Sequence, residues 1–283
     1  MKYGLFGINF GACADPATAA AVARAAEVAG FESLWTGEHV VLPDPQVPPS
    51  PVPAQVPFLD PAVALAMVSQ HTSRVLLGTG IIILPQRNPL VLAKELASVD
   101  VVSGGRLLFG VGIGYLEPEF RALGIPFDDK GARTMDYLRA MQAIWSMDRP
   151  AYDGRFASFC GVDAQPRPVQ KPHPPIVFGG HTAAAFRRAV EVAQGWYGFA
   201  MDVETTRKAI EGIRMEEGRR QRDEGLGRLE ISITPPAGLP DPDTARAYAD
   251  LGVDRLILLS ASPTKEAFLD YVRRAAETLI GRV

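Results

Sequence analysis

Residues 88–114 read NPLVLAKELASVDVVSGGRLLFGVGIG and contain one helix followed by one strand. The segment Asn88–Ser103 has a helical pattern, and the glycine pair that follows it ends that helix. An apolar run from Arg106 to Val111 then predicts a strand, which continues into a glycine-rich segment ending at Gly114. A helix, a glycine stop and an apolar strand form the repeating unit expected of an α/β fold.

The same unit recurs along the chain of 283 residues. Strands are expected at Tyr3–Asn9, Ser33–Thr36, Val75–Leu84, Arg106–Val111, Pro174–Phe178, Gly195–Phe199, Leu229–Thr234 and Arg255–Leu259. The first helix is predicted to begin at Asp15-Pro16, with aspartate as its cap, and to stop at Gly30. Later helices include Asp60–Thr72, Thr182–Ala193, Val203–Glu224, Pro242–Leu251 and Thr264–Ile280.

This alternation implies parallel strands joined by right-handed crossovers, and eight such units close into a barrel. We therefore expect an α/β fold, a (β/α)8 TIM barrel that residues 1–283 form as a single domain. The alternative is an open doubly wound sheet, whose first strand would lead into a G-x-G-x-x-G turn. The segment Asn9–Cys13 that follows the first strand lacks this spacing.

Two insertions are predicted in the barrel. Seven of the fifteen residues in 43–57 are proline, so this segment after the second strand is expected to be a long irregular loop, either a functional lid or a disordered tip. Before the fifth strand, Tyr152 and Phe156 flank the turn dipeptide Asp153-Gly154, which predicts a small hairpin within 150–168.

Composition narrows the function classes. A net charge of −3 argues against nucleic acid as a partner, and no apolar run is long enough to span a membrane. Cys13 and Cys160 have no C-x-x-C spacing, which is typical of a reducing compartment, so a cytoplasmic protein is expected. There is no G-x-S-x-G elbow and no H-x-H after the first strand, so neither an esterase nor a metal-dependent hydrolase is expected.

Catalytic residues of such barrels lie at the carboxyl ends of the strands. Candidates at those ends are Asn9, Glu38-His39, Gly112-Ile113-Gly114-Tyr115 and Gly179-Gly180-His181-Thr182, with an internal Thr79-Gly80-Ile81 in the third strand. The glycine pair before Thr182 suits a phosphate at a helix N-terminus, but a tight turn with a threonine cap explains it equally well. His39 could transfer a proton, or it could hydrogen-bond a backbone carbonyl.

The sequence resembles the luciferase-like flavin and deazaflavin oxidoreductases over nearly its whole length. The stretches that carry the resemblance are AEVAGFESLWTGEH at 26–39, LGTGI at 77–81, NPLVLAK at 88–94, SGGRLLFGVGIG at 103–114, DGRF at 153–156, PRP at 166–168 and PIVFGG at 175–180. Within the family it is most similar to the branch that uses coenzyme F420. The resemblance implies an oxidoreductase that transfers a hydride between F420 and a small organic substrate.

The resemblance also implies roles for the candidate residues. Gly80-Ile81 would be a non-prolyl cis peptide behind the cofactor ring, Gly112, Ile113 and Gly114 would line that ring, and Gly179, Gly180, His181 and Thr182 would hold the phosphate end. Glu38 and His39 would lie beside the redox carbon, with His39 as acid or base and Glu38 orienting it or holding the substrate. Tyr115 would donate a hydrogen bond to the developing oxyanion, and two copies would pair as a homodimer.

Two departures keep other functions open. In F420-dependent sugar-phosphate dehydrogenases an acidic proton donor would stand at the position of Tyr115, which weighs against sugar-phosphate oxidation. Glu38 replaces the usual aspartate before the histidine, and glutamate also occurs there in luciferases that use FMN. An FMN-dependent monooxygenase that activates O2 is therefore the alternative, and a barrel that binds a flavin-like ligand without turnover is the third possibility.

Overall fold

The computed structural model describes residues 1–282, and its main sheet is a closed parallel barrel. The barrel strands are β1 (Lys2–Phe6), β2 (Ser33–Thr36), β3 (Leu76–Thr79), β4 (Ile82–Ile83), β5 (Leu107–Gly112), β8 (Ile176–Gly179), β9 (Gly195–Gly198), β10 (Glu230–Ile233) and β11 (Arg255–Leu259). Strand β1 pairs with β2 and β11, and β3 pairs with β5, so the sheet closes on itself. The predicted (β/α)8 TIM barrel is confirmed.

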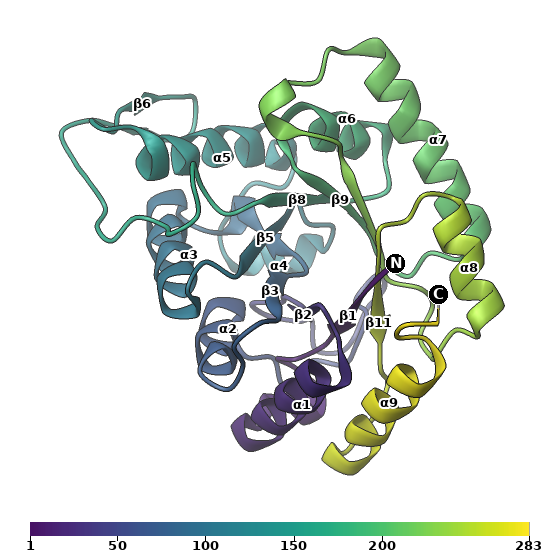
Figure 1. Cartoon of the computed structure of the whole chain (residues 1–283). Coiled ribbons are helices and arrows are strands. Elements are labelled where there is room, and N and C mark those ends of the chain that lie inside the picture. The colour runs from purple at the N-terminus through teal and green to yellow at the C-terminus, as the bar shows by residue number, and fades with distance from the viewer. Residues whose placement is uncertain (283) are drawn as a thin grey trace.

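The helices form an outer ring around the strands (Figure 1). They are α1 (Pro16–Ala29), α2 (Pro61–Ser69), α3 (Pro89–Ser103), α4 (Glu117–Ala122), α5 (Lys130–Ser146), α6 (Ala183–Val192), α7 (Val203–Arg219), α8 (Pro242–Asp250) and α9 (Lys265–Thr278). The predicted Asp15 cap accepts the N–H of Thr18, and Gly30 ends α1 with φ of 92°. Within residues 1–282, no helix combines the length and the apolar character needed to cross a membrane.

Both predicted insertions are present. The proline-rich segment after β2 contains no helix or strand, and its end is fastened where the N–H of Leu59 donates to the carbonyl of Asn9 at 2.9 Å. Before β8, the strands β6 (Tyr152–Asp153) and β7 (Ser158–Phe159) form the small antiparallel hairpin. The hairpin lies beside α5 at the edge of the barrel (Figure 1).

Three predicted boundaries are wrong. Strand β1 ends at Phe6 because Gly7 turns the chain with φ of 94°. The third strand divides into β3 and β4 at the Gly80-Ile81 peptide, which is cis as the resemblance implied. Helix α7 ends at Arg219, five residues early, and beyond it the Arg222 guanidinium donates to carbonyls at the end of α6.

The buried cation Arg255 lies at the amino-terminal ends of the barrel strands, which we call the lower end of the barrel. Arg255 is 2% exposed, donates to both carboxylate oxygens of Glu32 at 2.8 Å and also pairs with Glu230. Its guanidinium lies 5.7 Å from the centre of the Trp35 ring. Because charge and aromatic surface fill this end of the barrel, the opposite end is where a ligand can enter.

One glycine permits the closest approach between two barrel strands. A Cβ added to Gly110 of β5 would lie 1.7 Å from the carbonyl oxygen of Thr79 on β3. The same Thr79 hydroxyl donates to the carbonyl of Gly110 at 2.7 Å. Any side chain at position 110 would therefore push apart the two strands that close the barrel.

We expect Gly110→Ala to destabilise the fold by about 3 kcal/mol, the upper end of ordinary overpacking penalties, because the obstructing atom belongs to the backbone. Gly218→Ala is the matched control, since an added Cβ there meets no described atom within 4 Å. In helix α7 that change should stabilise by about 0.5–1 kcal/mol. Urea unfolding of the three proteins measures both effects, and equal stability of Gly110→Ala and the parent would contradict the strand contact.

Candidate active site

The site residues predicted from the sequence lie at the carboxyl ends of the barrel strands, which we call the upper end or rim of the barrel. All barrel pairings are parallel, so the carboxyl ends of β1, β2, β4, β5 and β8 share one rim. The side chain of Ile81, which lies between β3 and β4, packs against Gly112 and Gly179 at the ends of β5 and β8. The expected cofactor residues of the third, fourth and fifth barrel units are therefore neighbours.

Glu38 is buried at this rim and both of its carboxylate oxygens have partners. Oε1 accepts hydrogen bonds from the Arg87 guanidinium, one of them from Nε at 3.0 Å. Oε2 accepts the backbone N–H of Ile83, and Arg87 also donates to Asp60 at 2.8 Å. This network ties the loop after β2 to the starts of α2 and α3.

Burial raises the pKa of the Glu38 carboxyl, while the charge of Arg87 and the hydrogen bond from Ile83 oppose that shift. Burial acts to lower the pKa of the Arg87 guanidinium, but the charge and hydrogen bonds of Glu38 outweigh it, and the pKa is raised. Because arginine stays protonated, its charge favours the ionised form of Glu38, and the contact is a charge-assisted pair. Glu38 therefore holds the loop that carries His39.

His39 is the imidazole at the rim, and its side chain is 8% exposed. Its ring meets the ring of Phe58 edge-on at 5.8 Å and that of Tyr115 edge-on at 6.2 Å. Nδ1 of His39 lies 3.4 Å from Oε2 of Glu119, whose side chain is fully buried. The structure thus brings together the two predicted residues His39 and Tyr115 and a carboxylate that was not among the predicted site residues.

Glu119 belongs to α4, the short helix after β5. Its Oε1 accepts the backbone N–H of Val40 at 2.6 Å and that of Val41 at 3.4 Å. A signal for this residue was present in the sequence: Leu116 and Phe120 are buried one turn apart, and Glu119 lies on the same helical face. A carboxylate on an apolar face points to a partner elsewhere in the fold.

Tyr115 is half exposed at the rim. Burial and the negative charge of Glu119 raise the pKa of its phenol. The hydroxyl therefore stays protonated at neutral pH and is available as a hydrogen-bond donor.

Asn9 is a buried clamp. Its amide donates to the carbonyls of Gly37 and Leu59 at 2.9 and 2.7 Å, and its Oδ1 accepts the N–H of Gly37 at 2.9 Å. Both ends of the amide are occupied, so the side chain holds β1, the end of β2 and the end of the proline-rich loop together. Because its amide is engaged by the protein, the predicted contact of Asn9 with a cofactor stays a prediction.

The end of β8 has the geometry of an anion site. Gly180 has φ of 126°, and Thr182 caps α6 by accepting the N–H of Ala185. The N–H groups of Ala183 and Ala184, at the start of this ten-residue helix, have no hydrogen-bond acceptor within residues 1–282. A glycine turn before free N–H groups fits a phosphate.

Aromatic rings wall the space above the barrel. Phe10 and Phe58 stack at 4.9 Å, and Phe6 contacts Phe10 at 5.8 Å and Phe199 at 5.2 Å. Phe6 is the last residue of β1, and the other rings come from the loops after β1, β2 and β9. An apolar molecule would be desolvated favourably there.

The loops at this rim carry almost no positive charge. Within residues 1–282, the segments that lead from a barrel strand to the next helix contain a single basic residue, Arg87. It is already paired with Glu38 and Asp60. A negatively charged substrate would meet no free cation in these segments.

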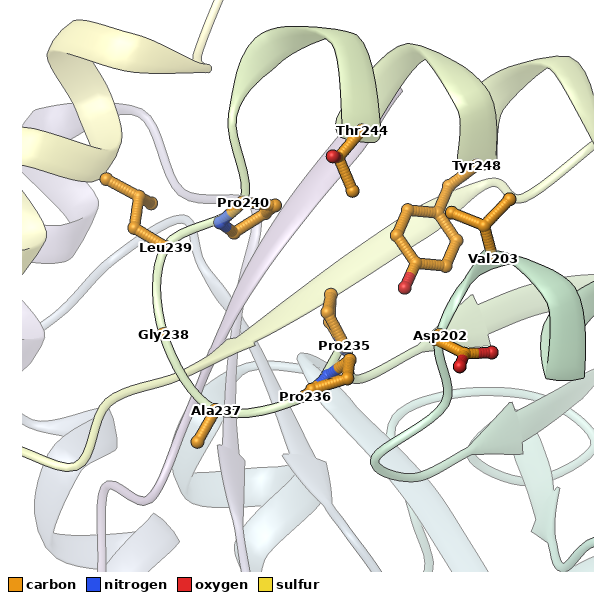
Figure 2. Close-up of a pocket in the computed structure, with 10 residues that line it drawn as sticks. All are labelled: Asp202, Val203, Pro235, Pro236, Ala237, Gly238, Leu239, Pro240, Thr244 and Tyr248. Carbon is orange, nitrogen blue, oxygen red and sulfur yellow. The ribbon is translucent and has the colours of Figure 1, made fainter.

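A separate cavity of about 240 Å³ lies between the loops after β9 and β10 (Figure 2). The loop Pro235–Pro240 forms one wall, and Asp202 and Tyr248 face it (Figure 2). The Tyr248 hydroxyl donates to the carbonyl of Met201 at 2.7 Å, and Asp202 accepts the N–H of Thr205 at 2.8 Å. None of the predicted site residues lines this cavity, so it lies outside the candidate site.

Removing the Arg87 side chain should lower the free energy of unfolding, because Glu38 would stay buried without its partner. We expect Arg87→Met to destabilise by about 3–5 kcal/mol near pH 8, because it leaves an unpaired buried carboxylate. Such a carboxyl has a raised pKa in the folded chain, so the folded state binds a proton more readily than the unfolded state and the loss should shrink as pH falls to 5.

Arg121→Met is the control for that change, since Arg121 forms an exposed pair with Glu117 that should contribute less than about 1 kcal/mol. Denaturant unfolding at pH 8 and pH 5 gives both numbers. A loss for Arg87→Met that does not depend on pH would show that Glu38 is not an ion in the parent.

Comparisons with known proteins place this barrel among redox enzymes. The family model described as luciferase-like monooxygenase matches residues 4–278. The uncharacterized protein Rv0953c of Mycobacterium tuberculosis is 31% identical over 273 residues, covering 93% of this chain and 94% of that protein. An FMNH(2)-dependent dimethylsulfone monooxygenase of Pseudomonas putida is 34% identical over 130 residues, covering 45% of this chain and 36% of that enzyme.

A solved structure has the same fold at lower identity. An F420-dependent secondary alcohol dehydrogenase, in complex with an F420-acetone adduct, superposes with a TM-score of 0.79 and 15% identity over 97% of both chains. This likeness shows that the two proteins share the barrel fold. The match over residues 4–278 establishes that the chain belongs to the luciferase-like monooxygenase family.

Proposed function

We propose that this protein is an F420-dependent oxidoreductase that transfers a hydride between the deazaflavin and a small uncharged substrate. The observation that carries the proposal is the rim itself. The buried imidazole of His39 lies beside the phenol of Tyr115. The same rim carries the Gly179–Thr182 turn, which we propose binds the cofactor phosphate at the start of α6. Support also comes from the F420-dependent alcohol dehydrogenase, whose barrel matches this one over nearly the whole chain.

The residues present fit a deazaflavin. Gly80-Ile81 and Gly112-Ile113-Gly114 would lie against its ring, and Gly179–Thr182 with the first N–H groups of α6 would hold its phosphate. The bound cofactor would supply the hydride chemistry. The protein's part is to place the substrate and to handle the proton.

His39 would give a proton to the substrate oxygen or take one from it, as the direction of the reaction requires. Tyr115, kept protonated, would donate a hydrogen bond to the same oxygen. Glu38 would act through position, by fixing the backbone that carries His39. The proline-rich segment 43–57 would cover the mouth and exclude water.

The second candidate function is an FMN-dependent monooxygenase that uses reduced flavin and O2. It is favoured by the similarity to the dimethylsulfone monooxygenase, which covers nearly half of this chain. The same phosphate turn would serve FMN, because both cofactors carry a phosphate on a similar ring system.

The charge of the rim favours an uncharged substrate. The single basic side chain of the strand-to-helix segments is already paired, and phenylalanine rings wall the space. A carboxylate or phosphate on the substrate would lose its hydration without gaining a cation, which costs several kcal/mol.

The homodimer implied by the resemblance stays a prediction. Val63 of α2 and Val91 and Val102 of α3 are all at least half exposed, and such an apolar surface on neighbouring helices suits a second copy. The mass of the native particle in solution would test it.

Titration of the purified protein with F420 and with FMN tests the cofactor. We expect F420 to bind about tenfold more tightly or better, and the reverse order would select the monooxygenase.

Ala183→Glu places a negative charge at the start of α6, where the helix dipole accepts it without loss of stability. It should weaken binding of either cofactor by about tenfold or more, since like charges near a surface repel by about 1–4 kcal/mol at contact distances.

Ala183→Gln is the neutral control, and it should change affinity by less than about twofold, because it adds no charge. If the Ala183→Glu and Ala183→Gln proteins bound the cofactor equally well, the proposed phosphate site at the start of α6 would be wrong. Failure of both cofactors to bind the parent protein would contradict both candidate functions.

Paired probes test the charge of the substrate. Alcohols and ketones of four to ten carbons, each with and without a carboxylate, would be compared in steady-state turnover of the cofactor-loaded enzyme. We expect kcat/KM of the charged member to be lower by about 100-fold or more, which corresponds to an unpaired charge penalty of about 3 kcal/mol. A preference for the charged members would contradict the proposal.

A further inference from the structure

We infer that Glu119 is the residue that positions the His39 imidazole for proton transfer. Nδ1 of His39 and Oε2 of Glu119 lie 3.4 Å apart, and both atoms are buried. Neither atom makes a hydrogen bond within residues 1–282, and at 3.4 Å each is placed to become the partner of the other. The use of this contact in turnover rests on the proposed function, whereas the contact itself does not.

The chemistry of the two groups determines the direction of a hydrogen bond between them. A carboxylate accepts hydrogen bonds, so in such a bond Nδ1 carries the proton. The neutral imidazole then keeps its lone pair on Nε2, the nitrogen left to face a ligand. A carboxylate behind a histidine in this way selects one tautomer and supports the imidazolium that forms when Nε2 takes a proton.

The other oxygen of Glu119 fixes the orientation of the carboxylate. Oε1 accepts the N–H of Val40 at 2.6 Å and of Val41 at 3.4 Å, the two residues that follow His39. The same carboxylate therefore holds the first residues of the loop that leads to the proline-rich segment and faces the imidazole at 3.4 Å. A movement of that loop would shift the carboxylate that faces the ring of His39.

The neighbouring acids cannot take this place. Both oxygens of Glu38 are engaged by Arg87 and by the N–H of Ile83. Glu117 lies on the exposed side of α4 and pairs with Arg121 in solvent. Of the three, Glu119 is the carboxylate with an oxygen free to face His39.

Glu119→Gln makes a sharp test because the amide has two different ends. Its oxygen is needed by the N–H groups of Val40 and Val41, which leaves the NH2 group toward Nδ1 of His39. An NH2 donor requires Nδ1 to be an acceptor, so the proton moves to Nε2 and the tautomer inverts. Glu117→Gln is the matched control on the same helix.

The measurement is the pair of imidazole 15N chemical shifts of His39 at pH 8, in protein without cofactor. The chain has four histidines, and a His39→Asn sample identifies the signals. We expect the Nδ1–H tautomer in the parent and in Glu117→Gln, and the Nε2–H tautomer in Glu119→Gln. An Nε2–H tautomer in the parent, which needs no variant, overturns the inference, and so does an unchanged tautomer in Glu119→Gln.

Turnover separates this inference from the proposed function. With a substrate found in the paired-probe screen, Glu119→Gln should lower kcat about 100-fold or more, with the affinity for cofactor unchanged, while Glu117→Gln stays at the parent rate. An inverted tautomer in a protein that binds neither cofactor would uphold the contact and refute the function. A full rate in a Glu119→Gln protein whose tautomer has inverted would overturn the positioning role.

Discussion

The buried carboxylate of Glu38 is the constraint on which the upper end of the barrel depends. An unpaired carboxylate there would be costly, so Arg87 must reach back from the loop before α3 to neutralise it. That contact joins the end of β2 to the segments that lead into α2 and α3. Because Arg87 is held in this pair, the rim has a fixed shape and its strand-to-helix segments, in the part of the chain that the structure describes, offer no unpaired positive charge.

This arrangement separates two tasks between two glutamates. Glu38 precedes His39 directly, yet its oxygens are spent on Arg87 and Ile83. Glu119 comes from another strand unit and presents a free oxygen to the imidazole. One acid therefore stabilises the loop, and the other is placed to control a proton, which is a division common where two carboxylates of different surroundings share a site.

The proposed phosphate site would suit either of the two candidate cofactors. Backbone N–H groups and a glycine turn at the end of β8 would hold a phosphate without depending on a particular ring. The phenylalanines above it set the polarity of the space that a substrate enters. Chemistry is then decided by the bound cofactor and by the proton donors that face it, rather than by the fold.

The sequence by itself determined the barrel, because helix caps and apolar periodicity are local signals. Asp15 and Gly30 mark the ends of α1, and the glycine-rich strand ends predict where a ligand is held. The tertiary structure alone decided that Glu119 faces His39 and that Glu38 faces Arg87. The hydrogen bonds from Val40 to Glu119 and from Arg87 to Glu38 join residues 79 and 49 positions apart. A periodic pattern reports which face of an element is buried, but not which distant group lies against it.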